Sequence, residues 1–362
     1  MSKTFFTPGP TQLHPKVKEY IKTALDSNLL SISHRSSKFD DLFANCAQSV
    51  RKLLGAPDKM PLFFLSSGTE AMERIIQNMA AKNTFHLVNG AFSERFYQTA
   101  KELGKNAQVL QAESGQGFNF GLINVPDNTE LICCTHNETS TGVMLRKEDW
   151  ESLKSLNPDK FIALDVVSSA PYCELDFKHI DATFFSVQKL FGLPAGLGVL
   201  LVSEAAISKS LQLMSAGTSI GTYHNFPTLI SFAKKFQTPA TPNVLGIYLL
   251  SKIAEEYLNI GIDQIRQDTI TKARYIYNFF EQHQQFKPFV DDRRFRSATV
   301  ITLNFKGEIK KLKTLLDKHN FEVGSGYGEF KDKQIRIANF PMHSLEQVKE
   351  LCTVLDSYPA KS

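Results

Sequence analysis

One lysine in this sequence lies where a lysine is unusual. Lys189 ends the stretch DATFFSVQK, in which an apolar run is followed by a Gly- and Pro-rich turn and a second apolar run. Burying an unpaired ammonium costs several kcal/mol unless it is neutralised or hydrogen-bonded. Forming a Schiff base with an aldehyde neutralises it, which predicts a catalytic lysine. The alternative is a strand-end lysine whose ammonium reaches solvent.

An aspartate precedes this lysine by about two dozen residues. Asp165 ends the apolar run FIALD and is followed by VVSSA. Its carboxylate can cap a following helix, or it can pair with the protonated nitrogen of a pyridine ring and make that ring a better electron sink. Lys189 and Asp165 together supply both requirements of such chemistry, so the pair is more specific than either member.

A small-residue loop joins the apolar run PLFFL to the helical stretch EAMERIIQNMAA. It contains Ser66, Ser67, Gly68 and Thr69. Hydroxyl groups and free backbone N–H groups at a helix N-terminus, with its partial positive charge of roughly +0.5, can bind a phosphate. An ordinary helix cap is the alternative.

Two further residues follow apolar runs. Phe92, in NGAF, offers a flat face to a flat ring, although core packing is the default for a chain with 28 Phe. Thr139, in THNETSTG, offers a hydroxyl to a ring substituent, or belongs to an ordinary turn.

The elements that must position these residues form an α/β pattern. From about residue 50 to residue 202, short apolar runs alternate with amphipathic stretches, which predicts a mostly parallel sheet with ligands at the carboxyl ends of its strands. After Pro239 and Pro242 the pattern indicates a smaller α+β domain. We expect a large domain over residues 16–243, and a small domain over residues 244–362 joined by residues 1–15.

Composition and charge further limit the class of protein to which the chain can belong. The chain has 362 residues and a net charge of +4 without charge blocks, which gives poor support for a nucleic-acid or membrane surface. No signal-peptide core and no membrane-length apolar run is present, so we expect a cytoplasmic protein. Its five cysteines lack C-x-x-C spacing, and neither disulfides nor a metal site is expected.

Taken in order, the motifs resemble the class V, fold-type-I aminotransferases, and within them the phosphoserine enzymes. They span almost the whole chain: FTPGPTQLHP, ISHRSSKF, SSGTEAM, HNETSTG, ALDVVSSA, SVQKLFGLPAGLG, FQTPATPN and IRIANFP. The resemblance implies a homodimer with shared active sites that binds pyridoxal 5'-phosphate. Lys189 would then form the internal aldimine, Asp165 would pair with the ring nitrogen, Phe92 would stack on the ring, and Thr139 would bond the ring hydroxyl.

The resemblance also implies roles for two further sets of residues. The cofactor's oxygens would be bound by Ser67, Gly68, Thr69 and Gln188, and the phosphate of the other subunit's cofactor by Gln237 and Thr238. The substrate would be bound by Arg336 at its α-carboxylate, and by His34 and Arg35 at its phosphate or γ-carboxylate.

The chain departs from that pattern at one position. Bacterial phosphoserine enzymes carry an arginine where this chain has Thr69, followed here by Glu70. Losing one charge-assisted contact costs about 1.5–3 kcal/mol, so phosphoserine binding would weaken. In this respect SSGTEAM is more like the alanine–glyoxylate and serine–pyruvate enzymes.

These observations predict a ping-pong transamination from phosphoserine to 2-oxoglutarate, in serine biosynthesis. A class V aminotransferase acting on alanine, serine or glyoxylate is the nearest alternative. A pyridoxal-phosphate lyase or desulfurase shares the fold and the lysine, but a desulfurase needs a mobile cysteine. A binding protein that keeps the fold without the cofactor is the non-enzymatic alternative.

Overall fold

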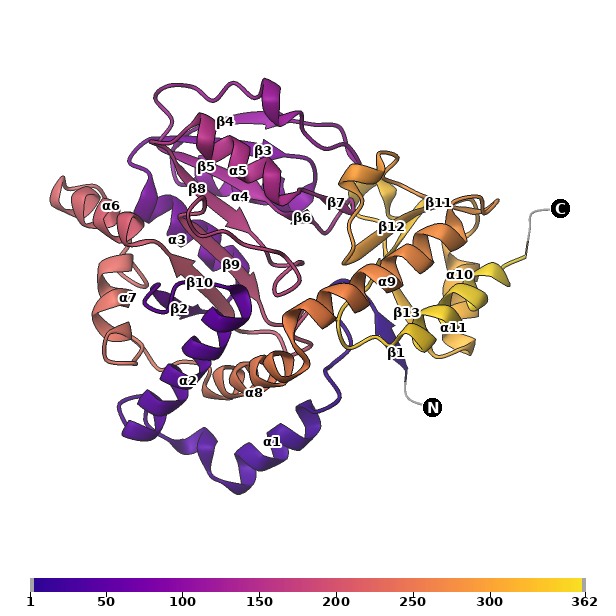
Figure 1. Cartoon of the computed structure of the whole chain (residues 1–362), viewed down its shortest axis with the longest axis horizontal. Helices are drawn as coiled ribbons and strands as arrows, with labels where there is room; N and C mark the ends of the chain where they lie inside the picture. Colours follow the sequence, from indigo (N-terminus) through magenta and orange to yellow (C-terminus); the bar gives the residue numbers. More distant parts are fainter. Residues whose placement is uncertain (1–2, 360–362) are drawn as a thin grey trace.

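The strands of the central sheet are short apolar runs, most of them buried on both faces. The computed structural model describes residues 3–359, and its larger sheet has seven strands in the order β2-β10-β9-β8-β5-β3-β4 (Figure 1). These strands are β2 (Leu62–Leu65), β3 (Asn83–Val88), β4 (Asn106–Gln111), β5 (Leu131–Thr135), β8 (Phe161–Asp165), β9 (Ala182–Ser186) and β10 (Gly198–Val202). β10 runs antiparallel to both of its neighbours, whereas the pairs from β9 to β4 are parallel. The predicted mostly parallel α/β sheet is confirmed.

Helices cover both faces of this sheet, because alternate strand residues point to opposite sides. Phe64 and Leu164 enter one core, and Phe63 and Ala163 enter the other. The first core is closed by α1 (Val17–Asp26), α2 (Ser37–Leu54), α5 (Lys147–Leu156) and α8 (Val244–Ile260). The second is closed by α3 (Gly68–Met79), α4 (Ala91–Glu102), α6 (Glu204–Ser215) and α7 (Phe226–Ala233).

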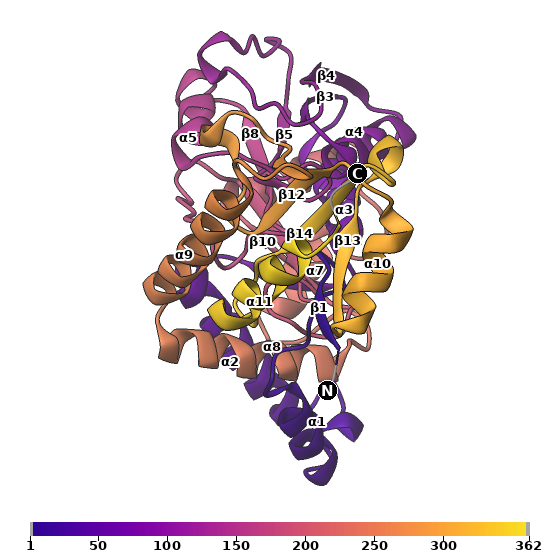
Figure 2. The same ribbon diagram turned by 90° about the vertical axis from the view of Figure 1, so that its right-hand side faces the viewer.

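A second, five-stranded sheet has the order β1-β13-β14-β12-β11. Its strands are β1 (Thr4–Phe6), β11 (Phe286–Pro288), β12 (Val300–Phe305), β13 (Phe321–Ser325) and β14 (Gln334–Ala338). Its core contains residues of α9 (Ile262–Phe280), α10 (Ile309–Lys318) and α11 (Leu345–Asp356), which lie along it in Figure 2. Ile335 and Ile337 of β14 enter that core, so Arg336 between them points the other way, toward the large sheet.

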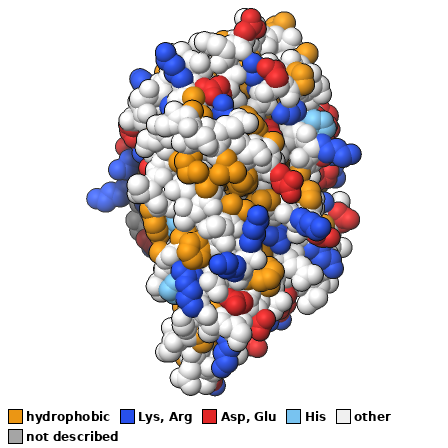
Figure 3. All heavy atoms as spheres, turned by 90° about the vertical axis from the view of Figure 1, so that its left-hand side faces the viewer, with side chains coloured by type: hydrophobic (Ala, Val, Ile, Leu, Met, Phe, Trp, Pro, Cys, Tyr) orange, Lys and Arg blue, Asp and Glu red, His pale blue; other side chains and the backbone are white. Residues whose placement is uncertain are grey.

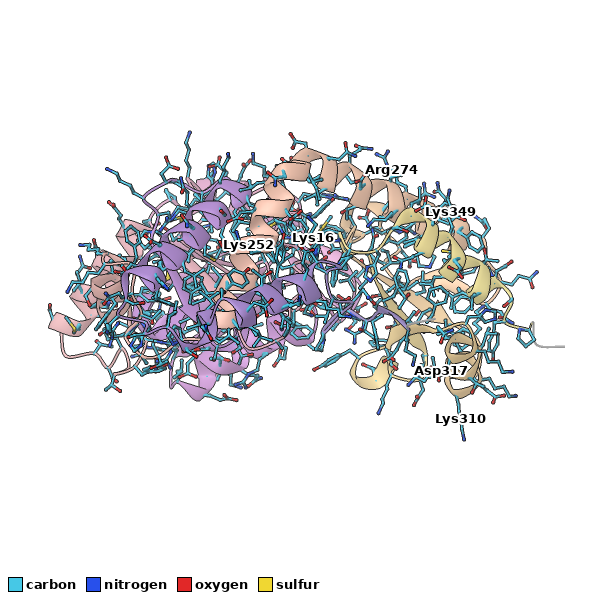
Figure 4. All side chains as sticks on the ribbon, turned by 90° about the horizontal axis from the view of Figure 1, so that it is seen from below. Lys16, Lys252, Arg274, Lys310, Asp317 and Lys349 are labelled. Carbon is cyan, nitrogen blue, oxygen red and sulfur yellow. The ribbon has the colours of Figure 1, made fainter. Side chains whose placement is uncertain are left out.

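The N-terminal segment belongs to the small sheet and then crosses to the large one. β1 pairs in parallel with β13. Farther on, the backbone N–H of His14 donates to the carbonyl of Gly192. Lys16 lies close to α8 (Figure 4), where its ammonium pairs with Glu256 at 2.7 Å. The segment between β1 and α1 therefore bridges the two sheets.

The packing of α8 bears on the proposed domain boundary. We expected the small domain to begin at residue 244, but α8 lies in the core of the large sheet, against α2. On this packing we would draw the boundary at Gly261, between α8 and α9. None of the helices within residues 3–359 has the length and apolar character that a membrane crossing requires.

Candidate active site

The parallel strands bring the predicted aspartate and lysine to one edge of the large sheet. Asp165 is the last residue of β8, and Lys189 follows the end of β9 by three residues. β8 and β9 are hydrogen-bonded neighbours, with Asp165 paired to Phe184. On the other side of β8, Thr135 of β5 pairs with Asp165, so the loop that carries Thr139 leaves from the same edge.

Lys189 is buried, with 6% of its surface exposed. Its ammonium donates a hydrogen bond of 2.5 Å to the carbonyl of Pro8 and lies 5.5 Å from the centre of the Phe92 ring. Burial, and to a smaller extent the nearby charge of Arg336, lower the pKa of Lys189 to about 8, while Asp165 opposes both effects. With this pKa, a larger fraction of Lys189 is free amine near neutral pH than in an ordinary lysine, and the free amine is the form that attacks an aldehyde.

The carboxyl group of Asp165 is equally buried. One of its oxygens accepts the backbone N–H of Val167 at 2.8 Å. Burial raises the pKa of Asp165 to about 7, and the Glu138 carboxylate contributes to that rise. A cationic partner would stabilise the ionised form of such a buried carboxyl group.

A cavity of about 520 Å³ opens beside Lys189, between the two sheets. It is lined by four of the predicted residues: Phe92, Thr139, Lys189 and Arg336. The N-terminal segment forms another wall through Pro8 and Gly9. The cavity thus contains four of the residues that the sequence assigned to one site, together with Pro8, to which the sequence analysis gave no role.

Arg336 reaches this cavity from β14 of the small sheet. Its guanidinium donates to the carbonyl of Ser325 at 2.7 Å and to the carbonyl of Thr139 at 3.0 Å. It also lies 5.6 Å from the centre of the Tyr327 ring. Burial lowers its pKa from the ordinary value. These contacts hold a planar, bidentate donor in place for a carboxylate.

The Ser66–Thr69 loop begins α3, as predicted, and the Ser67 hydroxyl caps that helix by accepting the N–H of Glu70. The N–H of Gly68 is also engaged, because it donates to the Ser186 hydroxyl at 2.8 Å. The Ser66 N–H and hydroxyl both donate to Glu70. The loop therefore has fewer free donors than its sequence suggests.

Glu70 is the centre of a network that sequence reasoning did not find. Its carboxylate accepts from Ser66 and contacts Nδ1 of His224 at 2.6 Å. Burial opposes ionisation, but the bonds from His224 and Ser66 prevail and hold the pKa of Glu70 at about 2. His224 in turn stacks on Tyr223, with ring centres 3.8 Å apart.

The remaining predicted residues do not line the cavity. Arg35, just before α2, donates to the carbonyls of Thr238 and Pro239 and to the side chain of Gln237. His34 is half-buried beside it. This cluster belongs to a second surface region, and within one chain the structure does not bring it to Lys189. Gln188 is half-buried next to Lys189, outside the cavity wall.

The positions of the five cysteines bear on the desulfurase alternative. All five are buried and unpaired, and burial raises the pKa of each thiol. None lines the cavity beside Lys189. The mobile cysteine that a desulfurase requires is therefore not supplied by this arrangement.

Comparison with known proteins agrees with this geometry. Residues 4–329 match the aminotransferase class-V family. The crystal structure of a phosphoserine aminotransferase from Cytophaga hutchinsonii is 45% identical, with a TM-score of 0.97 and 99% of each chain covered. A phosphoserine aminotransferase from Rhodococcus opacus is 25% identical, over 96% of this chain and 93% of its own length. The alanine–glyoxylate aminotransferase structure from a Nostoc species shares the fold, with 20% identity, a TM-score of 0.77, and 98% and 95% of the chains covered.

Proposed function

The chain belongs to the class-V aminotransferases, and we propose that it transfers the amino group of phosphoserine to 2-oxoglutarate by a ping-pong reaction, as a step of serine biosynthesis. The observation that carries the proposal is the buried Lys189, held beside Asp165 at the edge of the sheet and open to the cavity that Arg336 enters. The phosphoserine aminotransferase of C. hutchinsonii, at 45% identity, supports the choice of donor.

The residues present fit pyridoxal 5'-phosphate. Lys189 would hold the aldehyde, and Asp165, whose buried carboxyl group accepts the Val167 N–H, would face the ring nitrogen. Phe92 would cover the ring, with Thr139 and Gln188 at its edge. The phosphate would lie at the start of α3, among Ser67, Gly68 and Thr69. When bound, this cofactor supplies an electron sink for the carbanion formed at the substrate's α-carbon.

Groups of the chain itself would then have separate roles in the amino transfer. The amine of Lys189, with its lowered pKa, would take the proton from the donor's α-carbon and return it on the other side of the transfer. Arg336 would hold the α-carboxylate through two parallel hydrogen bonds. The Pro8 carbonyl would receive the Lys189 amine between these steps, since the two groups are already hydrogen-bonded.

We also propose a homodimer whose active sites are shared. His34, Arg35, Gln237 and Thr238 lie outside the cavity of their own chain, as residues that serve a second chain's site would. Figure 3 shows apolar side chains gathered in the middle of one face of the molecule. The exposed large apolar residues of α6 and its neighbours are Leu211, Met214, Tyr223 and Phe236. Such a patch is typical of a protein interface.

One observation favours a second donor class. At Thr69 the chain lacks the arginine of the bacterial phosphoserine enzymes, and the neighbouring Glu70 places a carboxylate at the same helix start. A donor without a phosphate, such as alanine or serine, would not need that arginine. The second candidate function is therefore transamination of alanine or serine with glyoxylate or pyruvate.

The experiment is a product assay on protein loaded with pyridoxal 5'-phosphate. Phosphoserine with 2-oxoglutarate should yield glutamate, at a kcat/KM well above that of serine or alanine with the same acceptor. Lys189→Ala protein should yield none above background. Efficient use of alanine with glyoxylate, and none of phosphoserine, would replace the proposed donor.

A further inference from the structure

A buried carboxylate next to the cavity has no part in the reaction described so far. Glu138, at the end of the short strand β6 (Asn137–Glu138), is fully buried. One of its oxygens accepts the backbone N–H of Phe92 at 3.3 Å, the N–H of Ser140 at 3.0 Å and the Ser140 hydroxyl at 2.6 Å. The other accepts the N–H and the hydroxyl of Ser93, each at 2.9 Å. Burying a carboxylate is costly unless it is bonded in this way.

These bonds join two segments that are distant in sequence. Phe92 and Ser93 lie in the first turn of α4, whose N-terminal N–H groups have no partners within the helix. Ser140 lies in the turn between β6 and β7 (Val143–Met144), directly after Thr139. Glu138 therefore fixes the helix turn that carries the Phe92 ring relative to the loop that carries Thr139.

The approach of Glu138 depends on the glycine before the helix. A Cβ at Gly90 would overlap the Glu138 side chain and lie 2.5 Å from the Ser140 hydroxyl. The backbone of Gly90 is extended, a conformation open to any residue, so the reason for glycine here is space. The network also extends to the small sheet, because the carbonyl of Thr139 accepts a hydrogen bond from Arg336.

We propose that Glu138 is a positioning residue for the cofactor ring, which holds the Phe92 ring and the Thr139 hydroxyl at a fixed separation on the wall of the cavity. This inference rests on the proposed function, since it concerns the same cofactor. Glu138 does not line the cavity; its charge raises the pKa of Asp165, and it positions the cavity wall through the neighbours that it bonds. Fixing such groups in advance spares the cost of ordering them when a ligand binds.

The bonding pattern makes a sharp test possible. Each carboxylate oxygen of Glu138 accepts a backbone N–H, from Phe92 or Ser140 on one side and from Ser93 on the other. In Glu138→Gln, either orientation of the amide places its NH₂ group against a backbone donor. The substitution keeps the shape of the side chain and breaks the backbone bonding at one of its two oxygen positions.

Glu130 offers a matched control. Its carboxylate also accepts three backbone N–H groups, from Ala81, Lys82 and Asn83, and it pairs with Lys209. These residues lie at the start of β3, at the edge of the sheet opposite the cavity. Glu130→Gln thus disturbs a similar network without touching the cavity wall.

The experiment measures the dissociation constant of pyridoxal 5'-phosphate, followed by the absorbance of the lysine-bound cofactor. Glu138→Gln should weaken binding on the order of tenfold or more, as the loss of one charge-assisted hydrogen bond implies, and Glu130→Gln should change it far less. Hydrogen exchange on the cofactor-free protein should show faster exchange at residues 91–93 and 140–142 in Glu138→Gln alone. Ser93→Ala and Ser140→Ala, which each remove one hydroxyl donor, should act in the same direction by smaller factors and serve if Glu138→Gln does not fold.

The outcomes separate the two proposals. Wild-type protein that fails to bind the cofactor would overturn the proposed function. Wild-type protein that binds tightly, with Glu138→Gln or the serine variants binding equally well, would overturn the role of Glu138 and leave the function intact. An equal loss in Glu130→Gln and Glu138→Gln would also overturn it, because general destabilisation would then explain both.

Discussion

The ammonium of Lys189 donates a hydrogen bond to the carbonyl of Pro8, which lies 181 residues earlier in the chain, over 2.5 Å. The adjacent Gly9 has a φ of +143°, and a Cβ there would lie 2.5 Å from Cε of Lys189. The N-terminal segment and the lysine are therefore packed as one unit, although they belong to different sheets.

Gly9→Ala should reduce the transamination rate about tenfold or more, because the added methyl group displaces the Lys189 side chain from its position. Gly104→Ala is the control, since Gly104 also has a positive φ of +70° but nothing within 4 Å of the added Cβ. Steady-state kinetics on both proteins checks this. Equal losses would mean that backbone strain, and not contact with Lys189, is responsible.

Lys189 in the cofactor-free protein should react with an amine reagent with a midpoint near pH 8, well below the ordinary lysine value of 10.5. Burial is the larger cause, and the charge of Arg336 is the second. Arg336→Gln should therefore raise the midpoint, and Arg274→Gln, at a side chain that points outward in Figure 4, should not. Peptide mapping by mass spectrometry across pH gives the result; a midpoint at 10.5 in the wild type would refute the assignment.

Asp165→Asn should stabilise the cofactor-free chain in a pH-dependent way. Burial raises the pKa of Asp165 from 3.8 to about 7, so between these values the folded chain binds more protons than the unfolded chain. Stability is consequently lost as pH rises through this window. The variant should match the wild type near pH 4 and exceed it by up to about 4 kcal/mol at pH 8. Urea unfolding at both pH values tests this, and a difference independent of pH would contradict it.

Shared active sites predict complementation between two inactive variants. Lys189→Ala and Arg35→Ala chains, unfolded and refolded together, should form mixed dimers in which one site has both residues intact. Random pairing of equal amounts would restore about a quarter of wild-type activity. Refolding each variant with itself is the control. No recovery in the mixture, with dimers formed, would show that Arg35 serves no neighbouring site.

Most of the fold could be predicted because apolar runs such as FIALD and LICCT have the length and spacing of buried parallel strands. The core that α8 joins could not be predicted. An amphipathic pattern shows that a helix has a buried face but does not show which core that face joins, and α8 packs on α2 although it follows the Pro-rich segment.

The candidate site, too, could be predicted only in part from the sequence. Lys189 and Asp165 could be predicted because burying an ionisable group at the end of an apolar strand costs free energy. Pro8 contributes a backbone carbonyl, which every residue possesses, so no signal marks it. Glu138 was hidden because its burial depends on donors from α4, about 45 residues away. Its one sequence signal was its place between Asn137 and Thr139 in a loop already selected for its hydroxyl groups.

The central claim is tested most directly by a single-turnover measurement on the cofactor-loaded protein. Phosphoserine, glutamate, serine and alanine are added separately without an oxo acid, and the absorbance of the lysine-bound cofactor is followed. The account predicts rapid loss of that absorbance with phosphoserine and glutamate, and far slower loss with serine and alanine. Rapid loss with alanine or serine, and none with phosphoserine, would contradict it and assign the chain to the other branch of its family.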